Sequence, residues 1–346
     1  MKYDGYIINK VDNNTIDVQW ELGNWCNFRC VYCFDESNIG THRPPLVDEN
    51  LIQNVTHLYK EIRSHYPEKH VTWTLSGGEP TAQKKFSKLI ECLDTFDNSH
   101  VILVTNGSRP LTWWKKNVQY VPHIILSSHP ESKIEHNIEL VKLLSKNKSV
   151  VSISIMIGGQ NFSEAVSVFK KYRFTTEEEY THTQIRFNRI RPTSRNKDFI
   201  ALTKEQHMLL DKITDDYQKH KKRNRSILPT LGIEARPYRT VTYNENTHTY
   251  EWFQNFSNFQ GNWIGYDCYA PSHSIFIEWD GTIGNLPCKQ RYMDDVNIFD
   301  KRFTQQYNLP VTPMVCNKSF KECNCVAAAH APKVLTKQTE GAIITV

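Results

Sequence analysis

Short apolar runs alternate with segments of helical periodicity from residue 15 to residue 190 of this chain. The apolar runs are rich in β-branched residues, and several are apolar along most of their length, which is typical of strands buried on both faces of a sheet. We expect strands at residues 15–20, 71–75, 101–105, 124–126, 150–157 and 184–190. Apolar residues at helical spacing predict helices within residues 51–62, 86–96, 134–144 and 162–172. The alternation predicts about six β-α units around a parallel sheet.

Serial β-α units wind with right-handed crossovers and form a barrel or part of one. We expect an α/β fold in which a partial (β/α)6 barrel, similar to a TIM barrel, carries functional groups in the loops after its strands. The pattern changes after about residue 195, and 346 residues leave room for roughly two domains. We predict the barrel over residues 1–200, a connecting helix and linker over 201–255, and a small C-terminal domain with a β-hairpin over 256–346.

The composition narrows the class of protein. Hydrophobic residues make up 39% and charged residues 23% of the chain, as in an ordinary globular protein. No apolar run approaches the roughly 18 residues that a membrane-spanning helix needs, and the first ten residues lack the apolar region of a signal peptide. We therefore expect a cytoplasmic protein that does not enter the membrane. The net charge of +5 permits an anionic small molecule or a nucleic acid as partner without requiring either.

Nine cysteines are unevenly placed in this sequence. Cys26, Cys30 and Cys33 follow the first predicted strand with the spacing C-x3-C-x2-C, whereas Cys92 falls on a predicted helix as a small core residue. Clustered thiols in a reducing compartment indicate metal binding or catalysis rather than disulfides. A structural zinc site closes with four ligands, and no fourth Cys or His stands near the three. A cubane iron-sulfur cluster held by three cysteines leaves one iron open to another ligand.

Two motifs on consecutive predicted strands resemble those of the radical SAM (S-adenosylmethionine) superfamily. The segment Cys26-Asn-Phe-Arg-Cys30-Val-Tyr32-Cys33 is similar to the cluster-binding motif of that family, and Ser76-Gly77-Gly78-Glu79-Pro80 is similar to its GGEP motif. One β-α unit separates the two, as the partial barrel of the family would place them. The resemblance implies a radical SAM core that holds a 4Fe-4S cluster on the three cysteines and binds SAM.

The resemblance also implies which residues contact SAM. Glycines let the backbone approach a ligand closely, and a carboxylate accepts hydrogen bonds from an ammonium group. Hydroxyl and amide groups form hydrogen bonds with ribose, and an arginine pairs with a carboxylate. The predicted contacts are Tyr32, Gly77, Gly78, Glu79, Asn106, Ser127 and Arg186. His129 and Glu131 are candidates for acid-base catalysis on a substrate. Alternatively, they cap the following helix or line the SAM site.

A second group of cysteines lies in the last third of the chain, at Cys268, Cys288, Cys316, Cys323 and Cys325. Between the first two, the dipeptide Asp280-Gly281 predicts a β-hairpin that can bring them together. This arrangement resembles the twitch domain, a short form of the SPASM domain that holds one auxiliary cluster. The resemblance implies an auxiliary iron-sulfur cluster, most simply 4Fe-4S, on Cys268, Cys288 and two of the last three. A structural zinc site on the same thiols is the alternative.

The predicted function follows from the resemblance. Reductive cleavage of SAM at the cluster would give a 5′-deoxyadenosyl radical that abstracts hydrogen from a substrate, oxidising or rearranging a polar small or carrier-bound molecule. A peptide side chain is the second choice of substrate and a nucleic-acid base the third. A reducing partner such as flavodoxin or ferredoxin would supply the electron. The alternative from another class is a zinc-binding structural protein without enzymatic activity.

Overall fold

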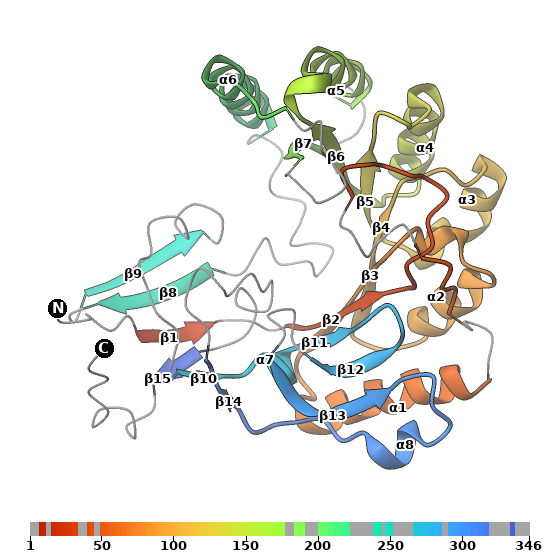
Figure 1. The fold of residues 1–346 in the computed structure, drawn as a ribbon, viewed down its shortest axis with the longest axis vertical. Coiled ribbons are helices and arrows are strands. Elements are labelled where there is room, and N and C mark those ends of the chain that lie inside the picture. Colours follow the sequence, from red (N-terminus) through yellow and green to blue (C-terminus); the bar gives the residue numbers. More distant parts are fainter. Residues whose placement is uncertain are drawn as a thin grey trace. The chain divides into compact units, whose positions relative to one another are not determined.

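A computed structural model of the chain describes residues 7–11, 15–33, 40–44, 49–176, 183–190, 200–221, 238–243, 246–251, 266–285, 290–317 and 333–335 (Figure 1). The chain divides into two compact units, which do not follow the sequence linearly. The first unit comprises residues 1–19, 48–72 and 234–346, and the second comprises residues 20–47 and 73–233. Strands β2 (Thr15–Glu21) and β3 (His70–Ser76) each contribute residues to both units.

The second unit is a series of parallel strands alternating with helices. Its further strands are β4 (Ser99–Thr105), β5 (His123–Ser128), β6 (Val150–Ile157) and β7 (Thr183–Arg189). Its helices are α2 (Phe86–Asp94), α3 (Leu111–Asn117), α4 (Ile134–Lys146), α5 (Phe162–Thr176) and α6 (Lys204–Lys221). The strands lie in the order β3-β4-β5-β6-β7, and the pairs from β4 to β7 are parallel. The predicted α/β class, strands and helices are confirmed, whereas the sequence pattern did not predict α3.

The core of this unit lies between the strands and their helices. Figure 1 shows α2 to α5 along one side of the strands. Leu103 and Leu126 are fully buried in their strands, and Leu89 and Leu140 are fully buried on the helix faces. Burying a leucine in this way stabilises a fold by about 1.5–3 kcal/mol. Because the helices cover one side of the strands, the loops at the carboxyl ends of the strands remain available for a functional site.

The first unit contains helix α1 (Glu49–His65) and mainly antiparallel strands. Its other elements are β1 (Ile7–Val11), β8 (Tyr238–Tyr243), β9 (Asn246–Glu251), β10 (Tyr266–Cys268), α7 (Ala270–His273), β11 (Ser274–Ile277), β12 (Thr282–Asn285), β13 (Arg291–Asn297), α8 (Phe303–Gln306), β14 (Met314–Val315) and β15 (Lys333–Leu335). Ile277 pairs with Ile283 across β11 and β12, so the predicted hairpin is confirmed. Gly281, in its turn, has a φ of +92°, a backbone conformation that favours glycine.

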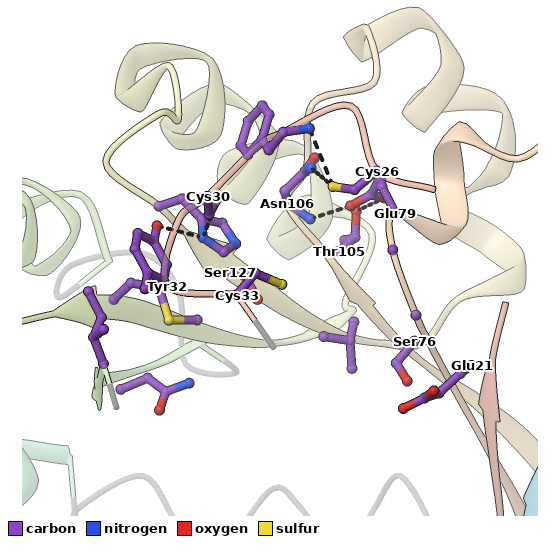
Figure 2. A pocket seen from close by; sticks show the side chains of 18 of the residues that line it. Glu21, Cys26, Cys30, Tyr32, Cys33, Ser76, Glu79, Thr105, Asn106 and Ser127 are labelled. Carbon is purple, nitrogen blue, oxygen red and sulfur yellow. Dashed lines mark hydrogen bonds between the residues drawn. The ribbon is translucent and has the colours of Figure 1, made fainter. Parts of the chain in front are cut away.

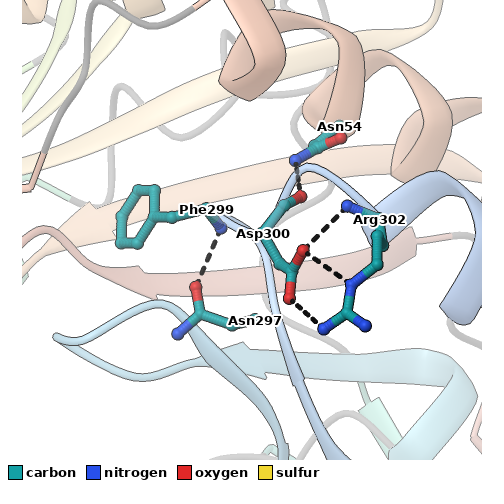
Figure 3. A network of polar contacts seen from close by, with 5 residues as sticks. All are labelled: Asn54, Asn297, Phe299, Asp300 and Arg302. Carbon is teal, nitrogen blue, oxygen red and sulfur yellow. Dashed lines mark hydrogen bonds and ion pairs between the residues drawn. The ribbon is translucent and has the colours of Figure 1, made fainter.

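Within this unit, α1 is joined to the segment between β13 and α8 by a buried amide (Figure 3). Asn54, only 1% exposed, donates from Nδ2 to the backbone oxygens of Ile298 at 2.7 Å and Asp300 at 2.8 Å. The Asp300 carboxylate in turn accepts from the backbone N–H of Arg302 at 2.8 Å. The amide thus bonds two backbone carbonyl groups of this segment, and that of Asp300 also accepts from the backbone N–H of Phe303 at 3.1 Å. No helix among the described residues is long and apolar enough to span a membrane.

Candidate functional site

A cavity of about 540 Å³ lies at the carboxyl ends of the strands of the second unit (Figure 2). Two sources supply its walls: the loop that carries the first three cysteines, and the residues at or just after the ends of β2 to β7. The lining residues are Glu21, Cys26, Phe28, Cys30, Tyr32, Cys33, Ser76, Gly77, Gly78, Glu79, Val104, Thr105, Asn106, Ser127, His129, Met156, Asn188, Arg189 and Ile190. Its volume is in the range of ligand-binding pockets.

Backbone hydrogen bonds hold the cysteine loop against the Gly-Gly turn that follows β3. The N–H of Gly78 donates to the oxygen of Gly23 at 3.0 Å, and the N–H of Glu79 donates to the oxygen of Trp25 at 3.0 Å. A Cβ atom on Gly78 would lie 2.1 Å from that Trp25 oxygen, and Gly77 has a φ of +123°. The two glycines therefore allow the turn and the segment leading to Cys26 to pack backbone against backbone.

The side chains of Cys26, Cys30 and Cys33 line the same cavity. Burial raises the pKa of Cys26 to about 11 and that of Cys30 to about 12, and the negative charge of Cys33 adds to both shifts. The backbone N–H of Phe28 donates to the sulfur of Cys26 at 3.3 Å. Three soft sulfur donors on one short loop, close enough to affect each other's pKa, fit a cluster held by three cysteines.

Glu79 is buried and is already hydrogen-bonded by the protein. Its Oε1 accepts from Thr81 N at 3.1 Å, Thr81 Oγ1 at 2.5 Å and Thr105 Oγ1 at 2.6 Å. Its Oε2 accepts from the backbone N–H of Asn106 at 2.7 Å, and Figure 2 shows the carboxylate directed toward Thr105 and Asn106. Burial raises the pKa of Glu79 while these bonds lower it. Since Oε1 already has three donors, Oε2 keeps most of the remaining capacity to accept from a ligand.

Asn106 and Ser127, both predicted to contact SAM, lie in the cavity wall. Asn106 also fastens the cysteine loop, because its Nδ2 donates to Oδ1 of Asn27 at 3.0 Å and stands 3.9 Å from the sulfur of Cys26. Arg186 is placed differently: it pairs with Ser154 within the sheet and does not line the cavity.

Two residues farther along β7 do line it, namely Asn188 and Arg189. The sequence pattern did not predict either as a site residue. Their position at the carboxyl end of a predicted strand was the signal that would have found them, because ligands bind at that end of parallel strands.

His129 and Glu131 lie beside the cysteine loop. The Nδ1 atom of His129 is 3.0 Å from the Tyr32 hydroxyl oxygen and 3.6 Å from the Cys30 sulfur. The Tyr32 hydroxyl donates to Oε2 of Glu131 at 3.1 Å. Burial lowers the pKa of His129 and raises that of Tyr32 far above its usual range, so at neutral pH the imidazole is uncharged and the phenol keeps its proton. One ligand atom each from Cys30, His129 and Glu131 lies within 4.8 Å of the others, a group able to hold a metal ion.

The second cysteine group is described only in part. Cys288, Cys323 and Cys325 lie outside the described residues. Cys268 and Cys316 are buried. Cys268 pairs with Met314 across β10 and β14, and Cys316 stands two residues beyond Met314. Cys316 directly follows the last residue of β14, so both cysteines lie at this strand pair.

Comparison with known families identifies the part of the chain that carries this cavity. A family model described as the radical SAM superfamily matches residues 20–172, which contain the three cysteines, the Gly-Gly turn, Asn106, Ser127 and His129. The chain therefore carries a radical SAM domain over these residues.

The individual similarities are distant. A GTP 3′,8-cyclase from Psychromonas ingrahamii is 28% identical over 102 residues, which are 29% of this chain and 28% of that protein. A GTP 3′,8-cyclase from Haemophilus influenzae is 33% identical over 96 residues, 26% of this chain and 27% of that protein. The matches thus span less than a third of the length of these relatives.

Among solved structures, SuiB of Streptococcus suis bound to S-adenosylmethionine matches with a TM-score of 0.52 at 12% identity. The match covers 86% of this chain and 66% of that chain. At this identity the likeness establishes a shared fold.

Proposed function

We propose that this protein cleaves SAM reductively at a 4Fe-4S cluster held by Cys26, Cys30 and Cys33 and uses the resulting radical to abstract hydrogen from a substrate. One observation carries the proposal: three cysteine side chains and the Gly-Gly turn of a radical SAM domain line one cavity at the carboxyl ends of parallel strands. We extend the proposal to the curvature of the sheet, which would form the partial (β/α)6 barrel of this family.

The residues of the cavity have different roles in the proposed reaction. The cysteines provide thiolates, and binding iron displaces the protons that burial holds on Cys26 and Cys30. A reduced cluster held by the three cysteines would supply one electron to SAM, and cleavage of the carbon–sulfur bond would give methionine and a 5′-deoxyadenosyl radical able to take a hydrogen atom from the substrate. The protein orients the reactants and excludes water.

We assign the SAM contacts as follows. Ser127 and Asn106 bond the ribose, Oε2 of Glu79 and the backbone carbonyls near Gly77 accept from the ammonium group, and Tyr32 contacts the adenine. A cation is needed for the methionyl carboxylate, and Arg189 lines the cavity whereas Arg186 does not. We therefore assign this pairing to Arg189.

For the substrate we propose a polar small molecule, free or carrier-bound, rather than a peptide side chain or a nucleic-acid base. The relatives over the radical SAM domain are named for a reaction on GTP, a polar small molecule, which supports this choice. Flavodoxin or ferredoxin is the proposed electron donor in a reducing cytoplasm.

We also propose an auxiliary iron-sulfur cluster on the C-terminal cysteines, in a domain of the twitch or SPASM type. Cys268 and Cys316 support it, since both are buried, Cys268 in β10 and Cys316 directly after β14, the strand that pairs with β10. This arrangement favours Cys316 as a ligand alongside Cys268, Cys288 and one of the last two cysteines.

Metal analysis of anaerobically reconstituted protein tests both clusters. We expect about eight iron and eight sulfide per chain in the wild type, and about four after Cys268→Ala or after Cys30→Ala. Cys92→Ala is the matched control, because Cys92 lies on α2 outside the cavity, and it should keep the full iron content. A colourless protein that binds zinc instead of iron and leaves SAM intact would replace the proposal with the zinc-protein alternative.

A further inference from the structure

We propose that His129 is a positioning residue that donates a hydrogen bond from Nδ1 to the Cys30 thiolate and thereby raises the reduction potential of the cluster. The inference rests on the proposed function, since it concerns the cluster on Cys26, Cys30 and Cys33. It depends on the contacts of His129 with two residues of the cysteine loop, Cys30 and Tyr32.

The protons available to Glu131, Tyr32 and His129 show that Nδ1 of His129 is a hydrogen-bond donor. The Glu131 carboxylate has no proton to give, so the hydroxyl of Tyr32 is the donor in their 3.1 Å hydrogen bond. The Tyr32 oxygen is then an acceptor toward His129, 3.0 Å away, and the proton between them belongs to Nδ1. The same N–H has the Cys30 sulfur 3.6 Å away, within hydrogen-bonding range of sulfur. A metal-bound thiolate is an acceptor only, so the N–H is shared between oxygen and sulfur.

The imidazole is also fixed by packing. Its ring stacks on Tyr32 with a centroid distance of 6.0 Å and an interplanar angle of 18°, and Phe28 meets it edge-on at 5.9 Å. The backbone N–H of His129 donates to the Ser132 hydroxyl at 3.0 Å, which anchors the turn after β5. Because the ring is held from two sides, little conformational freedom is lost when the hydrogen bond to sulfur forms.

A hydrogen bond to a ligating sulfur stabilises the more negative, reduced cluster more than the oxidised one, and such bonds are among the factors that set cluster potentials. Removal of the donor should therefore make reduction less favourable by about tenfold, which for a one-electron couple is about 59 mV toward more negative potential. The cluster should still assemble, since His129 is not one of its ligands in this proposal.

The test is an EPR-monitored redox titration of the reconstituted full chain, following the reduced signal that changes when SAM is added, with iron content and thermal melting measured alongside. His129→Phe keeps an aromatic ring and removes the donor, whereas His129→Asn keeps an N–H near the position of Nδ1. We expect full iron content in both, a shifted potential in His129→Phe, and a potential close to the wild type in His129→Asn.

An unchanged potential in a folded, fully loaded His129→Phe variant would overturn the proposal. Loss of iron from both variants would also overturn it, because His129 would then bind the metal itself or be required for folding. Failure of the proposed function is a separate result: the wild type would then show no SAM-responsive signal at all.

Discussion

The carboxylate of Glu79 accepts a 2.7 Å hydrogen bond from the backbone N–H of Asn106, so the turn after β3 is fastened to the end of β4. Thr81 and Thr105 add further bonds to the same side chain, which is 1% exposed. A buried charge is tolerated only when donors surround it in this way. Glu79 therefore organises the cavity wall in addition to offering Oε2 to a ligand.

Replacing Glu79 should destabilise the protein. In Glu79→Gln the new NH2 group faces N–H and O–H donors, so at least one charge-assisted bond is lost and a donor is left unpaired, at a cost of about 2–3 kcal/mol. A clear fall in melting temperature is the expected result. Glu164→Gln, at an exposed position of α5, is the matched control and should melt like the wild type. Equal melting of both variants would mean that the bonds around Glu79 contribute little.

Gly78→Ala should disable the cluster loop. The added Cβ would meet the Trp25 backbone oxygen at 2.1 Å, and because backbone cannot rotate away, the segment before Cys26 must move. We expect the first cluster to lose at least half of its iron. Gly158→Ala is the control, since its Cβ would meet the flexible Gln160 side chain at 2.7 Å, which can shift. Full iron loading of Gly78→Ala would show that the close packing is dispensable.

Asn54→Ala should destabilise the first unit without touching the cavity. The change leaves the carbonyls of Ile298 and Asp300 without the amide that bonds them, which costs about 1–3 kcal/mol. Gln53→Ala, one residue away and exposed on α1, should have almost no effect. Thermal melting compares the two, and a similar melting temperature for both would contradict the role of the buried amide.

His123 should make the protein acid-sensitive. Burial, with a smaller contribution from the positive charge of Arg186, lowers the pKa of His123 to about 4. In the unfolded chain the imidazole of His123 titrates near 6.5. Below that pH the unfolded state therefore binds a proton that the folded state does not bind. The contribution of His123 to the free energy of unfolding is fully present above about pH 6.5. It falls by about 3 kcal/mol as the pH drops to about 4.

His123→Gln should flatten this part of the dependence of unfolding free energy on pH, measured by denaturant titration at several pH values. His65→Gln, at an exposed position of α1, should keep the wild-type slope. Identical slopes for the wild type and His123→Gln would mean that His123 is protonated equally in both states.

Periodicity was enough to predict most of the strands and helices of the second unit. Residues 150–157 were expected as a strand and form β6 with the same bounds, because a nearly continuous apolar run is buried on both faces. Helix α3 was missed because its seven residues are too few for a helical period to stand out.

The site was predictable where motif and chemistry coincide and not where it depends on contacts distant in sequence. The three cysteines lie within one short motif, and the Gly-Gly turn lies within a second, so each can be recognised from neighbouring residues. In contrast, Thr105 and Asn106 lie 26 and 27 residues from Glu79, so its hydrogen bonds cannot be seen in the sequence. The contact of His129 with Cys30 spans 99 residues and was hidden for the same reason.

The most direct test of the account is the release of 5′-deoxyadenosine from SAM by the reconstituted protein under strong reductant, measured by chromatography without added substrate. We expect the wild type and Cys92→Ala to release it, whereas Cys33→Ala, which removes one thiol from the cavity, should release none. Equal release by Cys33→Ala, or none by a wild type that carries its full iron content, would contradict the assignment of this cavity to SAM cleavage.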